Sequence, residues 1–351
     1  MTDAALDAGW ANVPVLVTGA TGFIGGALAR RLHGLGARVT AQGRRAGADL
    51  TATGMQFVRG DLAEAATAEA ASAGQHYIFH CAALAAPWGP YKDFYRANVS
   101  ATEHLAAAAQ RQGAARFVHV STPSLYFAGE ARRNVRENDP LPTRQLTAYA
   151  DTKRLAEQVV AEAQAGGLPT VMVRPRAVFG PGDATIFPRL LRQVARGRLR
   201  VIGPGDNLAD LTYIDNVVDG LLLAARAPAA VGQVYNLTNG EPQPLWPLIV
   251  KVSAALGYGP PKGRVALRTA LALAGTLELT YLLLGIKREP PLTRYTVRML
   301  ALDATLDISA ARRDLGYAPR VSVDEGMQRF LAWWREQPAP PASASAEGGA
   351  E

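Results

Sequence analysis

Short apolar runs alternate with amphipathic, alanine- and leucine-rich stretches through the first half of the chain. The runs are rich in β-branched residues and predict strands at residues 13–18, 37–41, 56–58, 76–80, 116–120 and 170–173. The stretches between them predict helices, among them 22–33, 95–111 and 148–164. Nearly continuous apolar strands separated by helices are typical of a parallel sheet covered on both faces. The pattern therefore predicts an α/β fold with a doubly wound parallel sheet.

The pattern loosens after about residue 180. Strand-like segments at 199–202 and 234–237 are mixed with proline-rich turns and longer helices. We expect a first domain over residues 13–178, to which a segment at about 208–235 returns. Residues 179–207 and 236–336 would form a smaller α/β lobe towards the C-terminus. The last stretch, 337–351, has low complexity and predicts a disordered tail.

One apolar segment, 265–286, is long enough to cross a bilayer. It carries Arg268 and Glu278, and a charge at the centre of a membrane span costs roughly 2.5–3.5 kcal/mol on insertion scales. We therefore expect a helix of the lobe or a lid over the substrate, with a helix lying on a membrane surface as the alternative. A large apolar lid would indicate a hydrophobic substrate.

Composition narrows the class of protein. Of the 351 residues, 48% are hydrophobic and 19% charged, which indicates a globular chain. The formal net charge is +7, but the arginines are scattered without a basic arm, so we expect no nucleic-acid partner. The single cysteine, Cys81, excludes a disulfide framework, and the five histidines lack a ligand spacing, so no metal is expected. The N-terminal residues show no signal-peptide pattern, and the expected compartment is the cytoplasm.

Three glycines follow the first predicted strand at G-x-x-G-x-x-G spacing, where the chain turns after Thr18 into the next helix. Glycine lets a chain turn tightly, approach a pyrophosphate and pack a helix on the sheet, and the helix N-terminus offers free N–H groups to phosphates. The motif predicts a dinucleotide site, with a plain tight turn as the alternative. The expected contacts in the loop are Gly19, Thr21, Gly22, Phe23, Ile24 and Gly25.

The end of the second predicted strand bears on which dinucleotide binds. An acidic residue there would bond the ribose 2′-hydroxyl of NAD, but this strand ends in Gln42-Gly43-Arg44-Arg45. Arg44, and with it Arg45, can make charge-assisted bonds to a 2′-phosphate, so NADP(H) is expected in preference to NAD(H). A solvated pair of surface arginines is the alternative. Further expected cofactor contacts are Asp61 and Leu62 at the adenine, and Ala82 and Ala83 at the end of the fourth strand.

Tyr149 and Lys153 share one face of a predicted helix, about one turn apart. A neighbouring ammonium favours the phenolate of a tyrosine and lowers its pKa, and the neutral phenol can donate a proton to a carbonyl under reduction. The pair follows a strand that ends in hydroxyl-bearing residues, in the run Val120-Ser-Thr-Pro-Ser124. This arrangement indicates acid–base chemistry.

Together these motifs resemble the extended short-chain dehydrogenase/reductase superfamily, whose cofactor domain has the Rossmann fold. The resemblance covers about residues 13–335 and includes Asn98 and the runs at 174–183 and 212–217. It implies that Tyr149 is the catalytic acid/base and that Lys153 holds the nicotinamide ribose. It also implies that Thr122 orients the substrate oxygen, with Ser121 as a stand-in, and that Asn98 braces the site. Pro175 and Val178 are expected cofactor contacts, and a homodimer is the family expectation.

Within the superfamily the chain looks most like the 3β-hydroxysteroid dehydrogenase-like branch, and is similar there to bacterial 2-alkyl-3-oxoalkanoate reductases of olefin biosynthesis. Stretches at 82–89, 121–124, 239–242, 290–295 and 307–317 carry this likeness. The resemblance implies hydride transfer between NADP(H) and a 3-oxo or 3-hydroxyl group on a hydrophobic substrate, such as a 2-alkyl-3-oxoalkanoic acid or a steroid.

Two alternatives share the same motifs. A nucleotide-sugar epimerase or dehydratase usually has NAD and an acidic end of the second strand, which this chain lacks. A redox sensor or nucleic-acid binder would have no use for the Tyr149/Lys153 pair.

Several other residues are expected to have structural roles. We expect the Trp333-Trp334 pair to pack on the core, His80 and His119 to be satisfied core histidines, and Cys81 to be inert. Asp183 and Asp215 would shape the cleft or cap helices.

Overall fold

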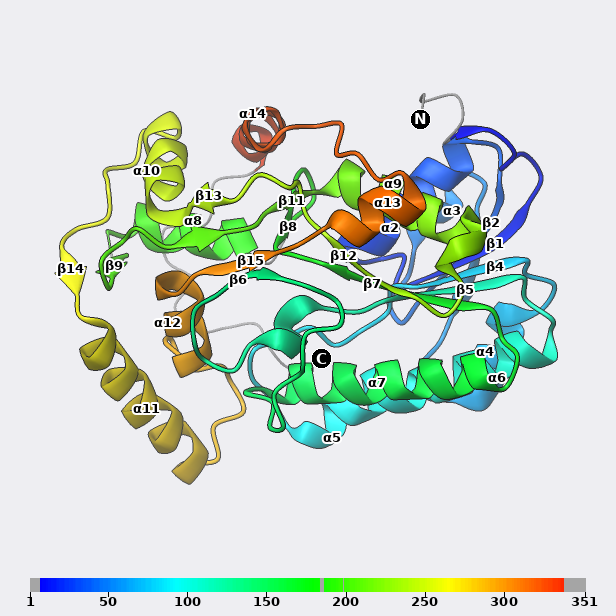
Figure 1. Cartoon of the computed structure of the whole chain (residues 1–351), viewed down its shortest axis with the longest axis horizontal. Helices are drawn as coiled ribbons and strands as arrows, with labels where there is room; N and C mark the ends of the chain where they lie inside the picture. The colour runs from blue at the N-terminus through cyan, green and yellow to red at the C-terminus, as the bar shows by residue number, and fades with distance from the viewer. Residues whose placement is uncertain (1–6, 184–185, 198, 338–351) are drawn as a thin grey trace.

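Seven parallel strands form the central sheet, in the order β12-β7-β5-β4-β1-β2-β3 (Figure 1). The structure is a computed structural model that describes residues 7–183, 186–197 and 199–337. The strands are β1 (Pro14–Thr18), β2 (Arg38–Gly43), β3 (Gln56–Arg59), β4 (Tyr77–His80), β5 (Arg116–Val120), β7 (Thr170–Pro175) and β12 (Val234–Leu237). The doubly wound parallel sheet is thereby confirmed. Of the predicted tail at 337–351, all but Gln337 lies outside the described residues.

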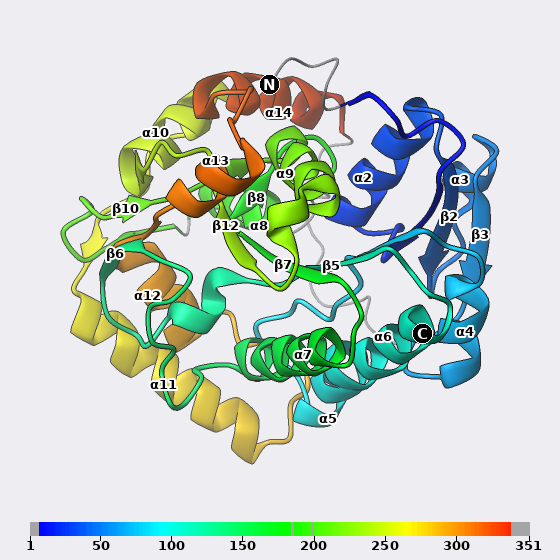
Figure 2. The ribbon, with the colours of Figure 1, turned by 45° about the vertical axis from the view of Figure 1, so that its right-hand side comes forward.

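Helices cover both faces of this sheet, because its strands are apolar on both sides (Figures 1 and 2). In β7, Val171 and Val173 belong to the core beneath α9, whereas Met172 belongs to the core beneath α7. On one side lie α2 (Phe23–Gly34), α3 (Ala48–Thr51), α9 (Ile214–Arg226) and α13 (Ser309–Leu315). On the other lie α4 (Ala65–Ser72), α5 (Tyr91–Phe94), α6 (Ala101–Arg111) and α7 (Ala148–Ala165).

The helical stretch predicted over 95–111 is present, but its first part is not α-helical. A π-helical turn, η1 (Tyr95–Ser100), precedes α6. This turn carries Asn98, which is almost fully buried and directs its amide between a loop and α7. Turns of this kind are frequent at functional sites.

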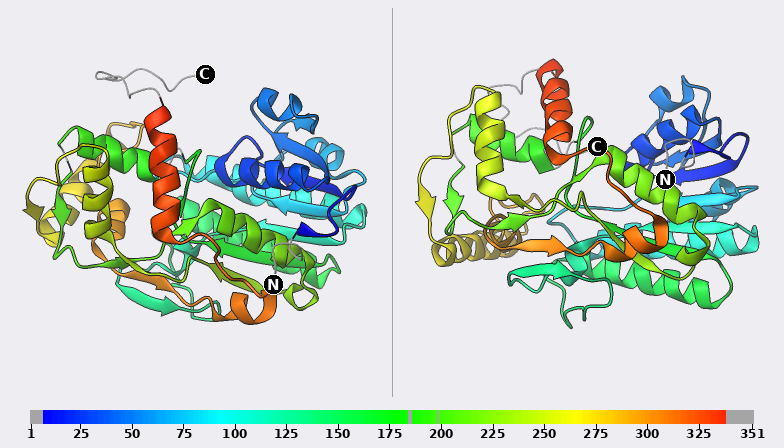
Figure 3. Two further views of the ribbon diagram at one scale, coloured as in Figure 1. Left: turned by 90° about the horizontal axis from the view of Figure 1, so that it is seen from above. Right: turned by 45° about the horizontal axis from the view of Figure 1, so that its top comes forward.

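The smaller lobe contains mixed and two-stranded sheets (Figures 2 and 3). One four-stranded sheet has the order β13-β10-β15-β6, and its members are β13 (Gln243–Pro244), β10 (Leu208–Ala209), β15 (Ala304–Leu306) and β6 (Arg132–Val135). The two-stranded sheets pair β8 (Val178–Phe179) with β11 (Thr212–Tyr213) and β9 (Val201–Ile202) with β14 (Arg264–Val265). The helices are α8 (Ile186–Ala195), α10 (Leu245–Ala255), α11 (Leu267–Leu283), α12 (Arg294–Ala301) and α14 (Val323–Glu336). Two 3-10 turns adjoin the main sheet: η2 (Pro123–Tyr126) follows β5, and η3 (Pro228–Ala230) joins α9 to β12.

The apolar segment at 265–286 forms α11 at the outer edge of the lobe (Figure 2). It buries Ala270 and Ala274 against the lobe core, and its Glu278 forms an ion pair with Arg294 of α12 at 2.6 Å. Its other side exposes leucines. Among the described residues, no helix is both long and apolar enough to cross a membrane.

Candidate active site

The glycine loop between β1 and α2 is a tight structure that other residues would not fit. Gly19 has φ +63°, and a Cβ there would lie 2.8 Å from the backbone of Ala82. A Cβ on Gly25 would lie 2.5 Å from the carbonyl oxygen of Gly19. The loop therefore packs directly on the end of β4 and on the first turn of α2, as the glycine spacing predicts.

The first turn of α2 is open to an anion. Gly22 occupies the N-cap and has no side chain to cap the helix, and the first turn contains no acidic residue. Free N–H groups and the positive end of the helix dipole therefore face the place where a phosphate would sit. Phe23 lies in this turn, and its ring is close to Gly182: a Cβ added to Gly182 would touch it. Ile24 follows Phe23 in the helix. These features fit the diphosphate of a dinucleotide.

The end of β2 presents two exposed arginines beside this loop. Arg45 donates a hydrogen bond to the carbonyl oxygen of Thr21 at 3.1 Å. The carbonyl oxygen of Arg44 accepts a hydrogen bond from the guanidinium of Arg59. Gln42, near the end of the same strand, is buried and donates to the carbonyl oxygen of Gly60. The region thus offers cations and no carboxylate at the end of this strand.

Asp61 follows β3 and is held by several partners. Its carboxylate accepts from the Ala63 amide at 3.0 Å and from the Arg96 guanidinium at 3.0 and 3.1 Å. Burial raises the pKa of Asp61, but these hydrogen bonds and the charges of Arg96 and Arg44 outweigh it, so the pKa lies below its ordinary value. Sequence reasoning missed Arg96, which ties Asp61 to the π-turn. Leu62 beside it is buried.

A buried hydroxyl–imidazole chain fixes the end of β4. Thr18 Oγ1 accepts from the amides of Cys81 and Ala82 and lies 2.9 Å from His80 Nδ1. Thr102 donates to the carbonyl oxygen of Asn98, so it must accept from His80 Nε2 at 3.0 Å. Burial, with a smaller effect of the Lys153 charge, lowers the pKa of His80 to about 3, and the ring is neutral. Burial also raises the pKa of the Cys81 thiol to about 12, so the thiol is protonated at neutral pH.

Asn98 connects three segments of the site. Its Oδ1 accepts from the Leu84 amide at 2.7 Å, and its Nδ2 donates to the Leu84 carbonyl and to Thr152 Oγ1 at 3.0 Å. Thr152 belongs to α7, next to Lys153. Asn98 therefore joins the loop after β4, where Ala82 and exposed Ala83 lie, to the helix that carries Tyr149.

The structure brings Tyr149 to Thr122. The side chain of Thr122 lies close enough to the phenol to lower its pKa, but burial has the larger effect and raises the pKa of Tyr149 to about 12. The hydroxyl of Ser121 is buried and makes no hydrogen bond among the described residues. The expected threonine, and not its neighbour, thus contacts the phenol.

Two residues beyond the expected set extend this contact. Thr122 Oγ1 lies 3.1 Å from Ser124 Oγ, and Ser124 Oγ lies 3.0 Å from the hydroxyl of Tyr295 on α12. The sequence contains no local signal for this link, because Tyr295 comes from the other lobe.

Lys153 is almost fully buried and bonds the neighbouring strand β5. Its ammonium donates to His119 Nε2 at 2.9 Å and to the Val120 carbonyl at 2.8 Å. Burial lowers the pKa of Lys153 to about 8, against the opposing charge of Glu157, and burial also lowers that of His119 far below its usual range. His119 is therefore a neutral acceptor, and one N–H of the ammonium remains for another partner.

Glu157 lies one turn beyond Lys153 and pairs with Arg174 of β7. Two hydrogen bonds of 2.8 and 2.5 Å join the side chains, and both are nearly buried. Spacing along the predicted helix could have identified Glu157, because residues i and i+4 share a face.

The remaining expected residues have clear positions. Pro175 ends β7 at the carboxyl edge of the main sheet, and Val178, which pairs with Thr212 in the two-stranded sheet, lies just beyond that edge. Asp183 accepts from the amide of Phe187 in α8 at 3.1 Å. Asp215 pairs with an arginine on α14 at 3.4 Å.

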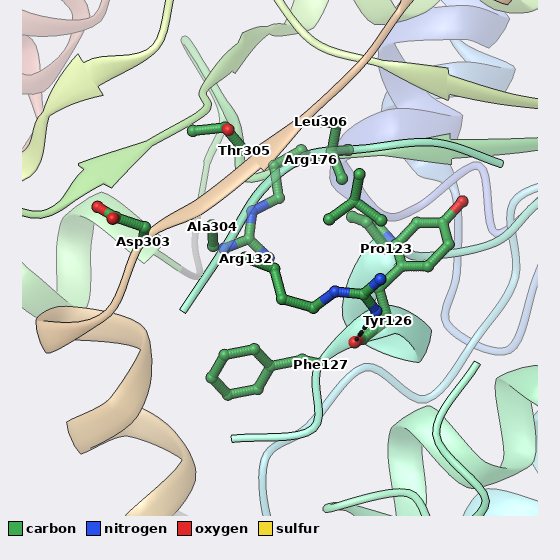
Figure 4. A pocket seen from close by; sticks show the side chains of 10 residues that line it. Pro123, Tyr126, Phe127, Arg132, Arg176, Asp303, Ala304, Thr305 and Leu306 are labelled. Carbon is green, nitrogen blue, oxygen red and sulfur yellow. Dashed lines mark hydrogen bonds between the residues drawn. The ribbon is translucent and has the colours of Figure 1, made fainter. Parts of the chain in front are cut away.

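A pocket lies beyond Thr122, between the main sheet and the lobe (Figure 4). Pro123, Phe127 and Leu306 give it apolar walls, and two arginines, Arg132 and Arg176, also line it. It lies next to the hydrogen-bonded row from Thr122 to Tyr295, because Phe127 packs edge-on against Tyr295.

A glycine loop on a parallel sheet, with a buried lysine and a tyrosine beside a strand-end hydroxyl, defines an enzyme that acts with a nicotinamide dinucleotide. Residues 15–238 match the NAD dependent epimerase/dehydratase family. The chain belongs to this family of extended short-chain dehydrogenases/reductases, in which the sequence placed it.

Three relatives illustrate the match. The chain is 38% identical over 324 residues to a 2-alkyl-3-oxoalkanoate reductase of Stenotrophomonas maltophilia, covering 91% of this chain and 98% of the relative. It is 30% identical to the mouse decarboxylating sterol-4-alpha-carboxylate 3-dehydrogenase, covering 90% and 89%. A solved structure of MoeE5 with UDP-glucose and NAD is 28% identical with a TM-score of 0.72, covering 92% and 98%.

The pKa of Lys153 yields a test of its role at the cofactor. The ammonium carries its charge below about pH 8 and loses it above, so a hydrogen bond from Lys153 to the cofactor should weaken as the pH rises through that value. We expect NADPH affinity, measured by fluorescence titration, to fall about tenfold between neutral pH and about pH 10. The Lys153→Met variant should bind weakly without this decline. An equal decline in both proteins would show that another group titrates.

Proposed function

We propose that the chain is an NADP(H)-dependent oxidoreductase that reduces a 3-oxo group, or oxidises a 3-hydroxyl group, on a hydrophobic substrate. A 2-alkyl-3-oxoalkanoic acid or a steroid is the substrate class. The observation that carries the reaction type is the contact between Tyr149 and Thr122, one helical turn from the buried ammonium of Lys153. The substrate class is supported by the names of the two relatives at 38% and 30% identity.

The chain's own residues supply the proton chemistry. NADPH, when bound, supplies the hydride. Tyr149 is a neutral phenol at physiological pH because its pKa is about 12, so it donates a proton to the carbonyl oxygen. Thr122 donates a hydrogen bond to the same oxygen as negative charge develops there. Lys153 bonds the cofactor's ribose with its remaining N–H, and its charge stabilises the phenolate that Tyr149 leaves.

The preference for NADP(H) rests on the exposed pair Arg44 and Arg45 beside Thr21. The remaining expected contacts are Gly19, Gly22, Phe23, Ile24 and Gly25 at the diphosphate, Asp61 and Leu62 at the adenine, and Ala82, Ala83, Pro175 and Val178 along the sheet edge. Asn98 is the proposed brace. The solved relative above holds NAD, so this preference is a property proposed for this chain.

A nucleotide-sugar epimerase or dehydratase is the second candidate. The family description and the UDP-glucose bound to MoeE5 favour it. Turnover assays on 2-alkyl-3-oxo acids, 3-ketosteroids and UDP-sugars separate the two candidates, because only the first should consume NADPH in proportion to product.

The apolar side of α11 supports peripheral contact of a cytoplasmic protein with a membrane. Leu279, Leu282, Leu283 and Leu284 are each more than half exposed, and Lys287 and Arg288 follow directly. Apolar side chains beside cations are the pattern that binds an anionic lipid surface.

A second copy of this chain is the other proposed partner. The family expectation is a homodimer through the helices that carry Asn98 and Tyr149, and Tyr91 and Tyr95 are exposed beside α7.

One pair of measurements checks these two partners. We expect the protein to sediment as a dimer and to float with vesicles that contain anionic lipid. The double substitution Leu282→Glu and Leu283→Glu should abolish flotation without changing the sedimentation coefficient. A monomeric sedimentation coefficient, or flotation that survives both substitutions, contradicts the corresponding proposal.

Removing the phenolic oxygen tests the acid/base. We expect Tyr149→Phe to retain NADPH binding and to lose turnover by about 10²- to 10⁴-fold, because a positioned proton donor contributes that much. Tyr91→Phe is the matched control, since its hydroxyl bonds Asp151 on the surface, and it should keep full turnover. Turnover by Tyr149→Phe at the wild-type rate would exclude the proposed role.

Reversing one charge tests the 2′-phosphate contact. We expect Arg44→Asp to weaken NADPH binding at least about tenfold and to leave NADH binding nearly unchanged, because it replaces a charge-assisted bond with repulsion. Arg38→Asp, at the opposite end of β2, should change neither affinity. Equal losses for both cofactors in Arg44→Asp would refute the contact.

A further inference from the structure

Arg176 lies close to the catalytic hydroxyl. Val120 of β5 pairs with Val173 of β7, and the Ser121 amide bonds the Val173 carbonyl at 2.7 Å. Thr122 continues with extended backbone, at φ −152° and ψ 141°. If this register is extended, Thr122 lies beside Pro175 on the neighbouring strand, about 4.8 Å away. Arg176 is the next residue after Pro175.

Hydrogen bonds hold the main chain of Arg176 at its amide and at its carbonyl. Its amide donates to the Leu237 carbonyl at 3.0 Å, and its carbonyl accepts from the hydroxyl of Thr212. These bonds come from β12 and from the start of β11, on the side away from β5. The main chain of Arg176 is therefore fixed at the carboxyl edge of the sheet, and the side chain extends from there.

Arg176 is half-buried, and its guanidinium makes few hydrogen bonds among the described residues. Its Nε is enclosed without a hydrogen bond, and its Nη2 has only the Met299 sulfur, a weak acceptor, at 3.8 Å. Among the described residues, no carboxylate lies within 4.0 Å of it. Arg174, two residues earlier, instead has Glu157 and Tyr126. A half-buried cation with few hydrogen bonds is costly, and a bound anion would relieve that cost.

The carboxylates around Arg176 are engaged elsewhere. Asp210 accepts from the Leu306 amide at 2.6 Å, and burial raises its pKa to about 6 against the opposing charge of Arg176. Asp303 bonds Arg133 at 2.8 Å and the Leu208 amide at 2.7 Å. The neighbouring cation in the pocket, Arg132, is itself paired with Asp139 and the Tyr126 carbonyl. Arg176 is thus the cation left for a ligand.

The surroundings of Arg176 join it to the reaction centre. Arg176 and Phe127 line the same pocket, and Phe127 packs against Tyr295, whose hydroxyl bonds Ser124 next to Thr122 (Figure 4). Arg176 therefore lines a pocket that borders the hydrogen-bonded row from Thr122 to Tyr295.

We infer that Arg176 binds the carboxylate of a 3-oxo or 3-hydroxy acid and makes the acid group a requirement for this chain's substrate. This inference rests on the proposed function. In such an acid only one carbon separates the carboxyl carbon from the reacting carbon. The anion site must therefore lie next to the phenol and Thr122, where Arg176 lies. A guanidinium binds a carboxylate through two parallel hydrogen bonds, which would also orient the reacting carbon.

A matched pair of substrates tests the assignment in the oxidation direction, where the acids are chemically stable. A 2-alkyl-3-hydroxy acid and its methyl ester are each assayed with NADP⁺ by the absorbance of the reduced cofactor. We expect wild-type kcat/KM to favour the acid at least about tenfold. Arg176→Met should lower it for the acid about 10- to 100-fold and leave the ester unchanged within about twofold. Arg176→Lys, which keeps the cation but not the bidentate geometry, should lose less.

Controls separate this inference from the function on which it rests. Arg132→Met, which removes the already paired arginine of the pocket, should change acid and ester by the same factor. A wild-type acid-to-ester ratio near one, an equal loss on both substrates in Arg176→Met, or weakened NADPH binding by that variant would overturn the role of Arg176 alone. Wild-type protein that oxidises neither substrate while binding NADP⁺ would contradict the proposed function itself.

Discussion

The burial of one ammonium group determines how the active site is assembled. Lys153 of α7 places its charge beneath the helix, where it donates to His119 and to the Val120 carbonyl of β5. A buried cation is tolerated only when acceptors and a counter-charge surround it. Glu157, one turn further along α7, supplies that charge and is itself held by Arg174 of β7. Two successive turns of one helix are thereby fixed to two adjacent strands.

The attachment of α7 to β5 and β7 also fixes the position of Tyr149, which lies one helical turn before Lys153. Because α7 cannot rotate without breaking these bonds, Tyr149 meets Thr122 at the end of β5, where the sheet, the glycine loop and the smaller lobe converge. Asn98 holds the other side of the helix through Thr152. The site is consequently built from rigid elements, and Arg176, which pairs with no carboxylate among the described residues, lines the pocket next to it.

Much of this arrangement could be predicted from the sequence, for physical reasons that also explain the omissions. The strands are apolar on both faces, so they stand out, and the glycines and the Tyr149/Lys153 pair are local patterns with fixed spacing. The π-turn at Asn98 could not be predicted, because bonds to Leu84 and Thr152, distant in the chain, accompany it. Strand β6, the link from Ser124 to Tyr295 and the missing partner of Arg176 likewise depend on contacts between segments. The roles of the individual site residues stay predictions.

A crystal structure with bound NADP⁺ tests the central claim most directly. The account predicts that the nicotinamide ring lies beside the Tyr149 hydroxyl, with Lys153 within about 3 Å of a ribose hydroxyl while it keeps its bonds to β5. A ring that lies away from Tyr149, or a Lys153 ammonium that bonds only His119 and Val120, would contradict it.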